Sequence, residues 1–102
     1  MIDKSLLEEI VTRLQKVKPI KMYLFGSQAS GTADDESDID LLLVKEIITS
    51  KIKETNDARK LLRGLGKSFD IIVTNQEEFD FYCTQVNSVH HAAANYGKVI
   101  YG

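Results

Sequence analysis

The sequence predicts an α/β or α+β fold in which a small mixed β-sheet is flanked by helices. Two observations carry this prediction. Segments with helical periodicity alternate along the chain with short apolar segments typical of strands, and no internal repeat or low-complexity tract interrupts them. With 102 residues, 43% of them hydrophobic and 27% charged, the chain can bury one modest core. We therefore expect a single domain over residues 1–102.

The first expected element is a helix that ends before Pro19. Apolar residues recur at helical spacing on one stripe, with charged residues largely opposite. Two N-terminal ends are possible for this helix: a capping box formed by Ser5 and Glu8, or an earlier start at Asp3. Proline forces the residue before it out of the helical region, so the helix must stop there. The apolar segment Ile20–Phe25 is then expected to form a strand.

The middle of the chain predicts two further strands with a helix between them. Ile39–Val44 is apolar on both faces after its second residue, which is typical of an interior strand covered by helices. A mostly polar helix is expected over about residues 50–63, with Gly64 and Gly66 as its stop. Phe69–Thr74 is the third expected strand.

Two helices are expected in the last third of the chain. Asn75 followed by Glu78 is another capping-box pattern and predicts a helix that continues to about Val86. A last short helix is expected over Ser88–Tyr96, with Gly97 as the residue that follows it. A terminal apolar segment completes the chain.

Composition excludes several classes of protein. The net charge is −2, from 13 basic and 15 acidic residues, which argues against duplex nucleic-acid binding through phosphate neutralisation. The single cysteine, Cys83, cannot form an internal disulfide and fits a reducing compartment. The longest apolar run is about five residues, against roughly 20 for a membrane span. We therefore expect a cytoplasmic protein with no membrane association.

Gly26 and Ser27 stand where the first strand ends and a polar stretch begins. Glycine allows a ligand to approach the backbone, serine can cap the turn that follows, and the backbone N–H groups of such a turn suit phosphate oxygens. Taken alone, the pair also fits an ordinary strand-ending turn.

Three acids near strand beginnings carry the chemical argument. Asp38 and Asp40 are two residues apart, so a strand would point both carboxylates to one face. They would repel each other without a cation, and Mg²⁺ is bound by carboxylates together with substrate phosphates. Alternatively, Asp38 only ends a loop and Asp40 pairs with a basic residue. Asp70 has the same place in the third strand, and three converging carboxylates would suit two-metal phosphoryl or nucleotidyl transfer.

The other polar clusters of the sequence do not predict a catalytic or metal site. The acidic run 34–36 is interpreted as a solvated loop. His90 and His91, with Cys83, match no tetrahedral zinc spacing, so we expect a histidine pair on a helix surface and a buried thiol. The chain has no GxxxxGK[ST] motif and hence no P-loop.

These residues resemble a known signature. Gly26-Ser27, ten residues and then Asp38-x-Asp40 are similar to the motif of the DNA polymerase β nucleotidyltransferase superfamily. The short chain, the SDID-LLLV continuation and the ending NYGKVIYG resemble its minimal nucleotidyltransferases, the MNT group.

The resemblance implies a mixed sheet with strands in the order one-two-three. It implies that Asp38 and Asp40 hold two Mg²⁺ ions, and that Asp70 binds the catalytic ion and helps to activate an acceptor hydroxyl. Gly26 and Ser27 would bind the phosphates of a nucleoside triphosphate, expected to be ATP. The reaction would transfer a nucleoside monophosphate and release pyrophosphate.

The resemblance also implies a partner. MNT proteins are commonly antitoxins paired with a small helical HEPN protein, and some are thought to adenylylate a tyrosine of that toxin. We expect a hetero-oligomer or homo-oligomer, with the region from Tyr96 to Tyr101 as an apolar candidate interface.

Two other functions stay open. Many relatives have arginine in the loop after Gly-Ser, where this chain has Gln28, Ala29 and Ser30. A binding module that neutralises a HEPN partner by contact alone is the alternative that this difference favours. An antibiotic-modifying transferase is a third possibility, although the sequence shows no second domain to hold a small acceptor.

Overall fold

The computed structural model describes residues 3–26 and 38–102. Within them, the elements in chain order are α1 (Lys4–Leu14), a 3₁₀ turn (Gln15–Val17), β1 (Lys21–Phe25), β2 (Ile39–Lys45), α3 (Lys51–Leu61), β3 (Phe69–Asn75), α4 (Gln76–Tyr82), α5 (Val89–Tyr96) and β4 (Lys98–Tyr101). No helix in the described ranges is both long and apolar enough to traverse a bilayer.

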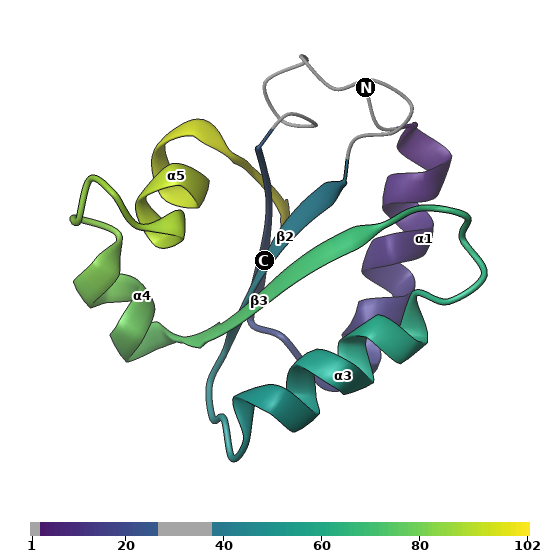
Figure 1. Ribbon diagram of the computed structural model, residues 1–102, viewed down its shortest axis with the longest axis horizontal. Helices are drawn as coiled ribbons and strands as arrows, with labels where there is room; N and C mark the ends of the chain where they lie inside the picture. Colours follow the sequence, from purple (N-terminus) through teal and green to yellow (C-terminus); the bar gives the residue numbers. More distant parts are fainter. Residues whose placement is uncertain (1–2, 27–37) are drawn as a thin grey trace.

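The strands form one mixed sheet in the order β3-β2-β1-β4. β1 is antiparallel to both β2 and β4, whereas β2 and β3 are parallel. The predicted small mixed sheet is confirmed, and so is the adjacency of the first three strands. The terminal apolar segment becomes a fourth strand beside the first (Figure 1).

Helices cover both faces of the sheet, α1 and α3 on one side and α4 and α5 on the other (Figure 1). Neighbouring residues of a strand point to opposite faces, so β2 contributes to two cores. Leu41 and Leu43 pack with Ile10 of α1 and Ala58 of α3. Leu42, on the other face, packs in the cluster that contains residues of α4 and α5. This is why the segment is apolar throughout.

The N-terminal helix begins at the earlier of its two expected starts. The Asp3 carboxylate accepts a hydrogen bond from the Ser5 backbone N–H (3.1 Å) and caps α1, so the capping box at Ser5 is wrong. After the 3₁₀ turn, Lys18 has a left-handed backbone with φ of 55°. Pro19 therefore ends the helical segment as predicted.

The helix α4 is shorter than predicted, because it ends at Tyr82 and does not reach Val86. The Ser88 side chain explains the early end, since its hydroxyl lies 2.6 Å from the Tyr82 carbonyl oxygen and 2.9 Å from that of Gln85. A helix that continued to Val86 would have bonded the Tyr82 carbonyl oxygen to the Val86 N–H. Asn75 caps α4 by accepting the N–H of Glu78, as expected.

In the C-terminal region Gly97 directly follows α5, as expected, and its φ is −87°. It is needed for its size, because a Cβ there would lie 2.7 Å from the Leu24 carbonyl oxygen. Two expectations about this region need correction. His90 is half-buried and not exposed on a helix surface, since its Nε2 lies 3.0 Å from the Thr74 hydroxyl and burial lowers its pKa. The Cys83 thiol is only half-buried.

A partly buried ion pair joins the end of β2 to the start of α3. The Lys45 ammonium contacts the Glu54 carboxylate. The same carboxylate accepts backbone N–H bonds from Thr49 (3.0 Å) and Ser50 (3.2 Å). The hydrogen bond from Lys45 is the main cause that lowers the pKa of Glu54 from its ordinary 4.5.

We expect Glu54→Gln to lower the free energy of unfolding by about 1–2 kcal/mol at pH 7. A carboxyl with a depressed folded pKa stabilises the fold above its unfolded pKa and loses that effect as the pH falls through the folded value. The difference from wild type should therefore shrink below about pH 4.5 in urea unfolding measurements. Glu46→Gln, at an exposed neighbouring position, is the control and should change little. An equal effect of both variants at every pH would contradict this role.

Candidate active site

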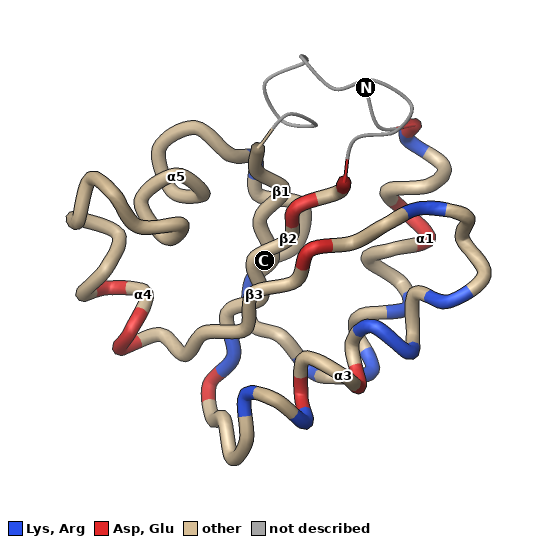
Figure 2. The backbone as a smooth tube through the Cα atoms, viewed as in Figure 1, with Lys and Arg blue, Asp and Glu red and all other residues tan. Residues whose placement is uncertain are grey.

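Three carboxylate residues lie at the end of the sheet where β2 and β3 begin. Asp40 of β2 and Asp70 of β3 are register partners in the parallel pair, so their side chains project from the same face. Asp38 precedes the first residue of β2. Figure 2 shows acidic positions of β2 and β3 side by side at this end. The structure thus brings together the three acids that the sequence singled out.

The carboxylates of Asp38, Asp40 and Asp70 influence one another electrostatically. Asp38 and Asp70 are exposed, whereas Asp40 is half-buried. Burial raises the pKa of Asp40, and the charges of Asp70 and then Asp38 raise it further. Among residues 3–26 and 38–102, none of the three forms an ion pair with lysine or arginine. The alternative in which Asp40 pairs with a basic residue is therefore not observed in this part of the chain.

Gly26 lies directly against the Asp40 carboxylate. Phe25 is the register partner of Asp40, which places the next residue of the chain beside the same side chain. A Cβ at Gly26 would stand 2.1 Å from the Asp40 Oδ2 atom, and the backbone φ there is +72°. Glycine is required here for both reasons. Ser27, expected as a phosphate ligand, lies outside the described residues.

The donor chemistry of the three acids fits a hard divalent cation. All of their potential ligand atoms are carboxylate oxygens, and the repulsion at Asp40 would be relieved by positive charge. Within the described ranges, no three His, Cys, Asp or Glu side chains are arranged to hold an ion by themselves. The fit of Asp38, Asp40 and Asp70 to Mg²⁺ therefore rests on their carboxylate chemistry, and substrate phosphates would have to complete the ligand set.

A basic groove next to these acids was missed by sequence reasoning. It has a volume of about 340 Å³ and is lined by Arg59, Arg63 and Lys67, with Leu62 and Phe69 among its apolar residues. The signal was present in the sequence, because residues 59–67 contain four basic residues and no acidic one. This segment was interpreted only as a helix and its stop.

Comparison with known proteins agrees with this geometry. The family model described as "Polymerase beta, Nucleotidyltransferase" matches residues 8–102. A protein of Methanocaldococcus jannaschii named "Putative protein adenylyltransferase" is 39% identical over 74 residues, which cover 72% of each chain.

Solved structures share the fold. A chain of a toxin–antitoxin structure with AMP-PNP has a TM-score of 0.68 and 25% identity, over 94% of this chain and 73% of that one. A chain of the tri-AMPylated Shewanella oneidensis HEPN toxin in complex with MNT antitoxin has a TM-score of 0.65, over 99% of this chain and 73% of that one. The second match, at 20% identity, is evidence of the fold alone.

Proposed function

Since the chain belongs to the polymerase β nucleotidyltransferase family and is a nucleotidyltransferase, we propose that it transfers AMP from ATP to a tyrosine of a HEPN-type toxin. It would thereby act as the antitoxin of that partner in the cytoplasm. The observation that carries the proposal is the in-register pairing of Asp40 with Asp70, with Asp38 adjacent. The name of the archaeal relative supports AMP transfer to a protein, and the toxin–antitoxin structure with AMP-PNP supports an adenine nucleotide and a toxin as partner.

Asp38 and Asp40 would hold two Mg²⁺ ions, and Asp70 would share one of them. When bound, such ions supply positive charge to the attacking and leaving oxygens of an in-line displacement. Positive charge would also stabilise the ionised carboxylates. Burial, and the negative charges of Asp70 and Asp38, raise the pKa of Asp40.

The groups of the chain itself would position the reactants and accept a proton. The acceptor oxygen forms a bond to the α-phosphorus of ATP, the bond to the bridging oxygen of the β-phosphate breaks, and pyrophosphate leaves. Asp70 is exposed and can accept the proton of the acceptor hydroxyl. Gly26 has no side chain, which leaves room for the Asp40 carboxylate directly beside the backbone.

The test uses ATP labelled at the α-phosphate, with Mg²⁺ and a purified HEPN-type protein from the same organism. We expect label on the HEPN-type protein with wild type, none with Asp38→Asn, and none from ATP labelled at the γ-phosphate. Mass spectrometry should place the added AMP on a tyrosine. Label from the γ-phosphate alone would indicate a kinase and overturn the proposal, as would equal transfer by Asp38→Asn.

The alternative is a module that neutralises its partner by contact alone. It is favoured by the lack of arginine in the loop after Gly26-Ser27, where this chain has Gln28, Ala29 and Ser30. In that case neither label would be transferred, while the partner would still co-purify with wild type and with Asp38→Asn. The two functions are therefore separated by the same experiment.

A further inference from the structure

The basic groove between the end of α3 and the start of β3 has no role in the reaction described so far. Its three cations, Arg59, Arg63 and Lys67, are all exposed. In Figure 2 the basic positions gather along the end of α3 and the segment that leads to β3. The chain as a whole is slightly acidic, so this concentration of positive charge is local.

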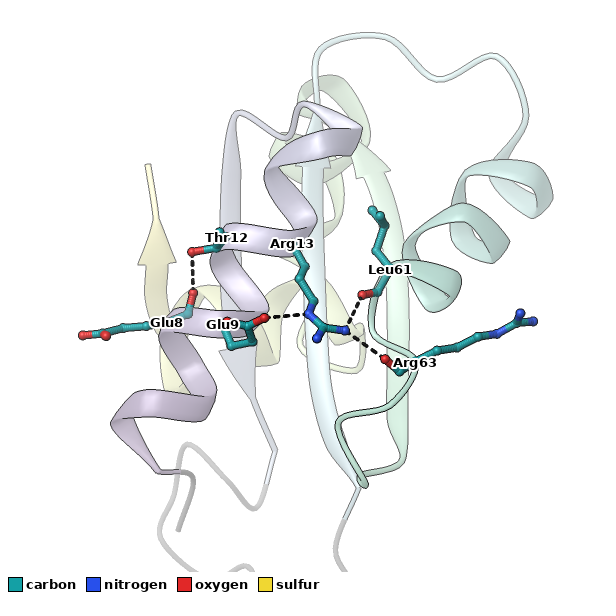
Figure 3. Close-up of polar contacts among 6 residues, drawn as sticks. All are labelled: Glu8, Glu9, Thr12, Arg13, Leu61 and Arg63. Atoms are coloured by element: carbon teal, nitrogen blue, oxygen red, sulfur yellow. Dashed lines mark hydrogen bonds and ion pairs between the residues drawn. The ribbon is translucent and has the colours of Figure 1, made fainter.

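Arg59 is in the last turn of α3, where the helix dipole favours a cation, but Arg63 and Lys67 lie beyond the helix and Arg13 bonds the carbonyls at its end. The Arg13 Nη1 group donates to the carbonyl oxygens of Leu61 (3.1 Å) and Arg63 (2.8 Å), while its Nε donates to Glu9 (2.8 Å). Figure 3 shows that the guanidinium of Arg63 extends away from this network. In the part of the chain that the structure describes, no acid pairs with Arg59, Arg63 or Lys67.

The groove adjoins the three acids across the first residues of β3. Phe69 lines the groove and packs against the α1–α3 core, and Asp70, the next residue, projects to the opposite face. The Ser68 carbonyl oxygen, also at the groove, accepts the N–H of Ile39 (2.9 Å). Asp38 is the neighbour of Ile39. Because β3 is an edge strand of the described sheet, a protein that presents a hydroxyl to Asp70 from this edge can also contact the groove on the other face.

We propose that the groove binds an acidic segment of the protein acceptor and so orients its hydroxyl toward Asp70. This inference rests on the proposed function. A nucleic acid is a poorer match, because its uniform negative charge would extend from a short groove onto the carboxylates at Asp38 and Asp70. A protein surface can place carboxylates on the cations and an uncharged hydroxyl at the acids. The apolar residues Leu62 and Phe69 suit the carbon chains of such a segment.

The main test compares two double variants that each remove two positive charges. Arg63→Gln with Lys67→Gln changes the groove, whereas Lys53→Gln with Lys60→Gln changes exposed positions of α3 that do not line it. Adenylylation of the HEPN-type protein is followed with each. We expect the groove variant to raise the KM for the protein acceptor about tenfold, with the KM for ATP and kcat unchanged, and the control to resemble wild type.

Direct binding separates this proposal from the proposed function. Asp38→Asn should bind the HEPN-type protein as wild type does, and adding the groove substitutions should weaken that binding about tenfold. This holds even if no AMP transfer is found. A wild-type chain that neither binds nor modifies the HEPN-type protein would overturn both proposals.

Labelled polyglutamate, oligothymidylate and inorganic triphosphate are the probes for the chemistry of the groove. Polyglutamate should bind wild type and the control but not the groove variant. If oligothymidylate binds wild type more tightly than polyglutamate does, and the groove variant no longer binds it, the groove is a nucleic-acid site and the proposal is wrong. A raised KM for ATP together with lost triphosphate binding would indicate that the groove holds the nucleotide. Equal acceptor KM in all three proteins would also overturn the proposal.

Discussion

Asp40→Asn is expected to lower AMP transfer by roughly a thousandfold while the fold is retained. Asparagine is nearly isosteric with aspartate, but it removes the negative charge that would hold a divalent cation between β2 and β3. Asp40 is the register partner of Asp70, and its carboxylate lies beside Gly26 at the same end of the sheet. Transfer of label from α-labelled ATP measures the loss.

The same variant is expected to be more stable than wild type at neutral pH. The pKa of Asp40 is raised from 3.8, so ionisation of this carboxyl opposes folding. That penalty is absent below the unfolded pKa, develops as the pH rises through the folded value, and is fully present above it. Thermal unfolding should show a higher Tm for Asp40→Asn at pH 7.5, and the difference should disappear near pH 3.5.

Asp57→Asn in α3 is the matched control. It should keep the AMP-transfer activity of wild type, and its stability should depend on pH as that of wild type does. Mg²⁺ should raise the Tm of wild type but not that of Asp40→Asn. Full transfer activity in Asp40→Asn, or an unchanged response to Mg²⁺, would show that the assignment of the carboxylate site is wrong.

Gly26→Ala is expected to disable the site through the Asp40 carboxylate. The new Cβ would stand 2.1 Å from Asp40 Oδ2, so the carboxylate must move. Displacement of a reacting group by about 1 Å can cost roughly a hundredfold in rate, and we expect a loss of this size. The backbone φ of +72° adds a stability cost of about 1 kcal/mol for alanine.

Gly66→Ala separates the two effects. Its φ of +73° nearly equals that of Gly26, yet a Cβ there would meet no atom within 4 Å. We expect this control to lose about 1 kcal/mol in urea unfolding and to keep full transfer activity. Equal activity losses in both variants would show that backbone strain, and not the contact with Asp40, is responsible.

Local patterns were sufficient to predict most elements of the fold. Apolar periodicity located the strands, and the capping residue Asn75 was correctly placed because an N-cap bond spans only three residues. Prediction failed where a distant side chain decides the boundary or the environment. The end of α4 depends on the Ser88 hydroxyl, and the burial of His90 depends on Thr74 of β3.

The candidate site divides in the same way. The sequence by itself determined that Asp38 and Asp40 are close, because two residues in an extended segment are separated by a single intervening residue. Only the tertiary structure decided that Asp70 is level with Asp40, since that depends on the register of the parallel pair β2–β3. The contact of Gly26 with Asp40 likewise depends on the register of β1 and β2. The hydrophobic pattern of each strand restricts its register, but which residues are level is decided when two strands far apart in the chain pack together against the helices.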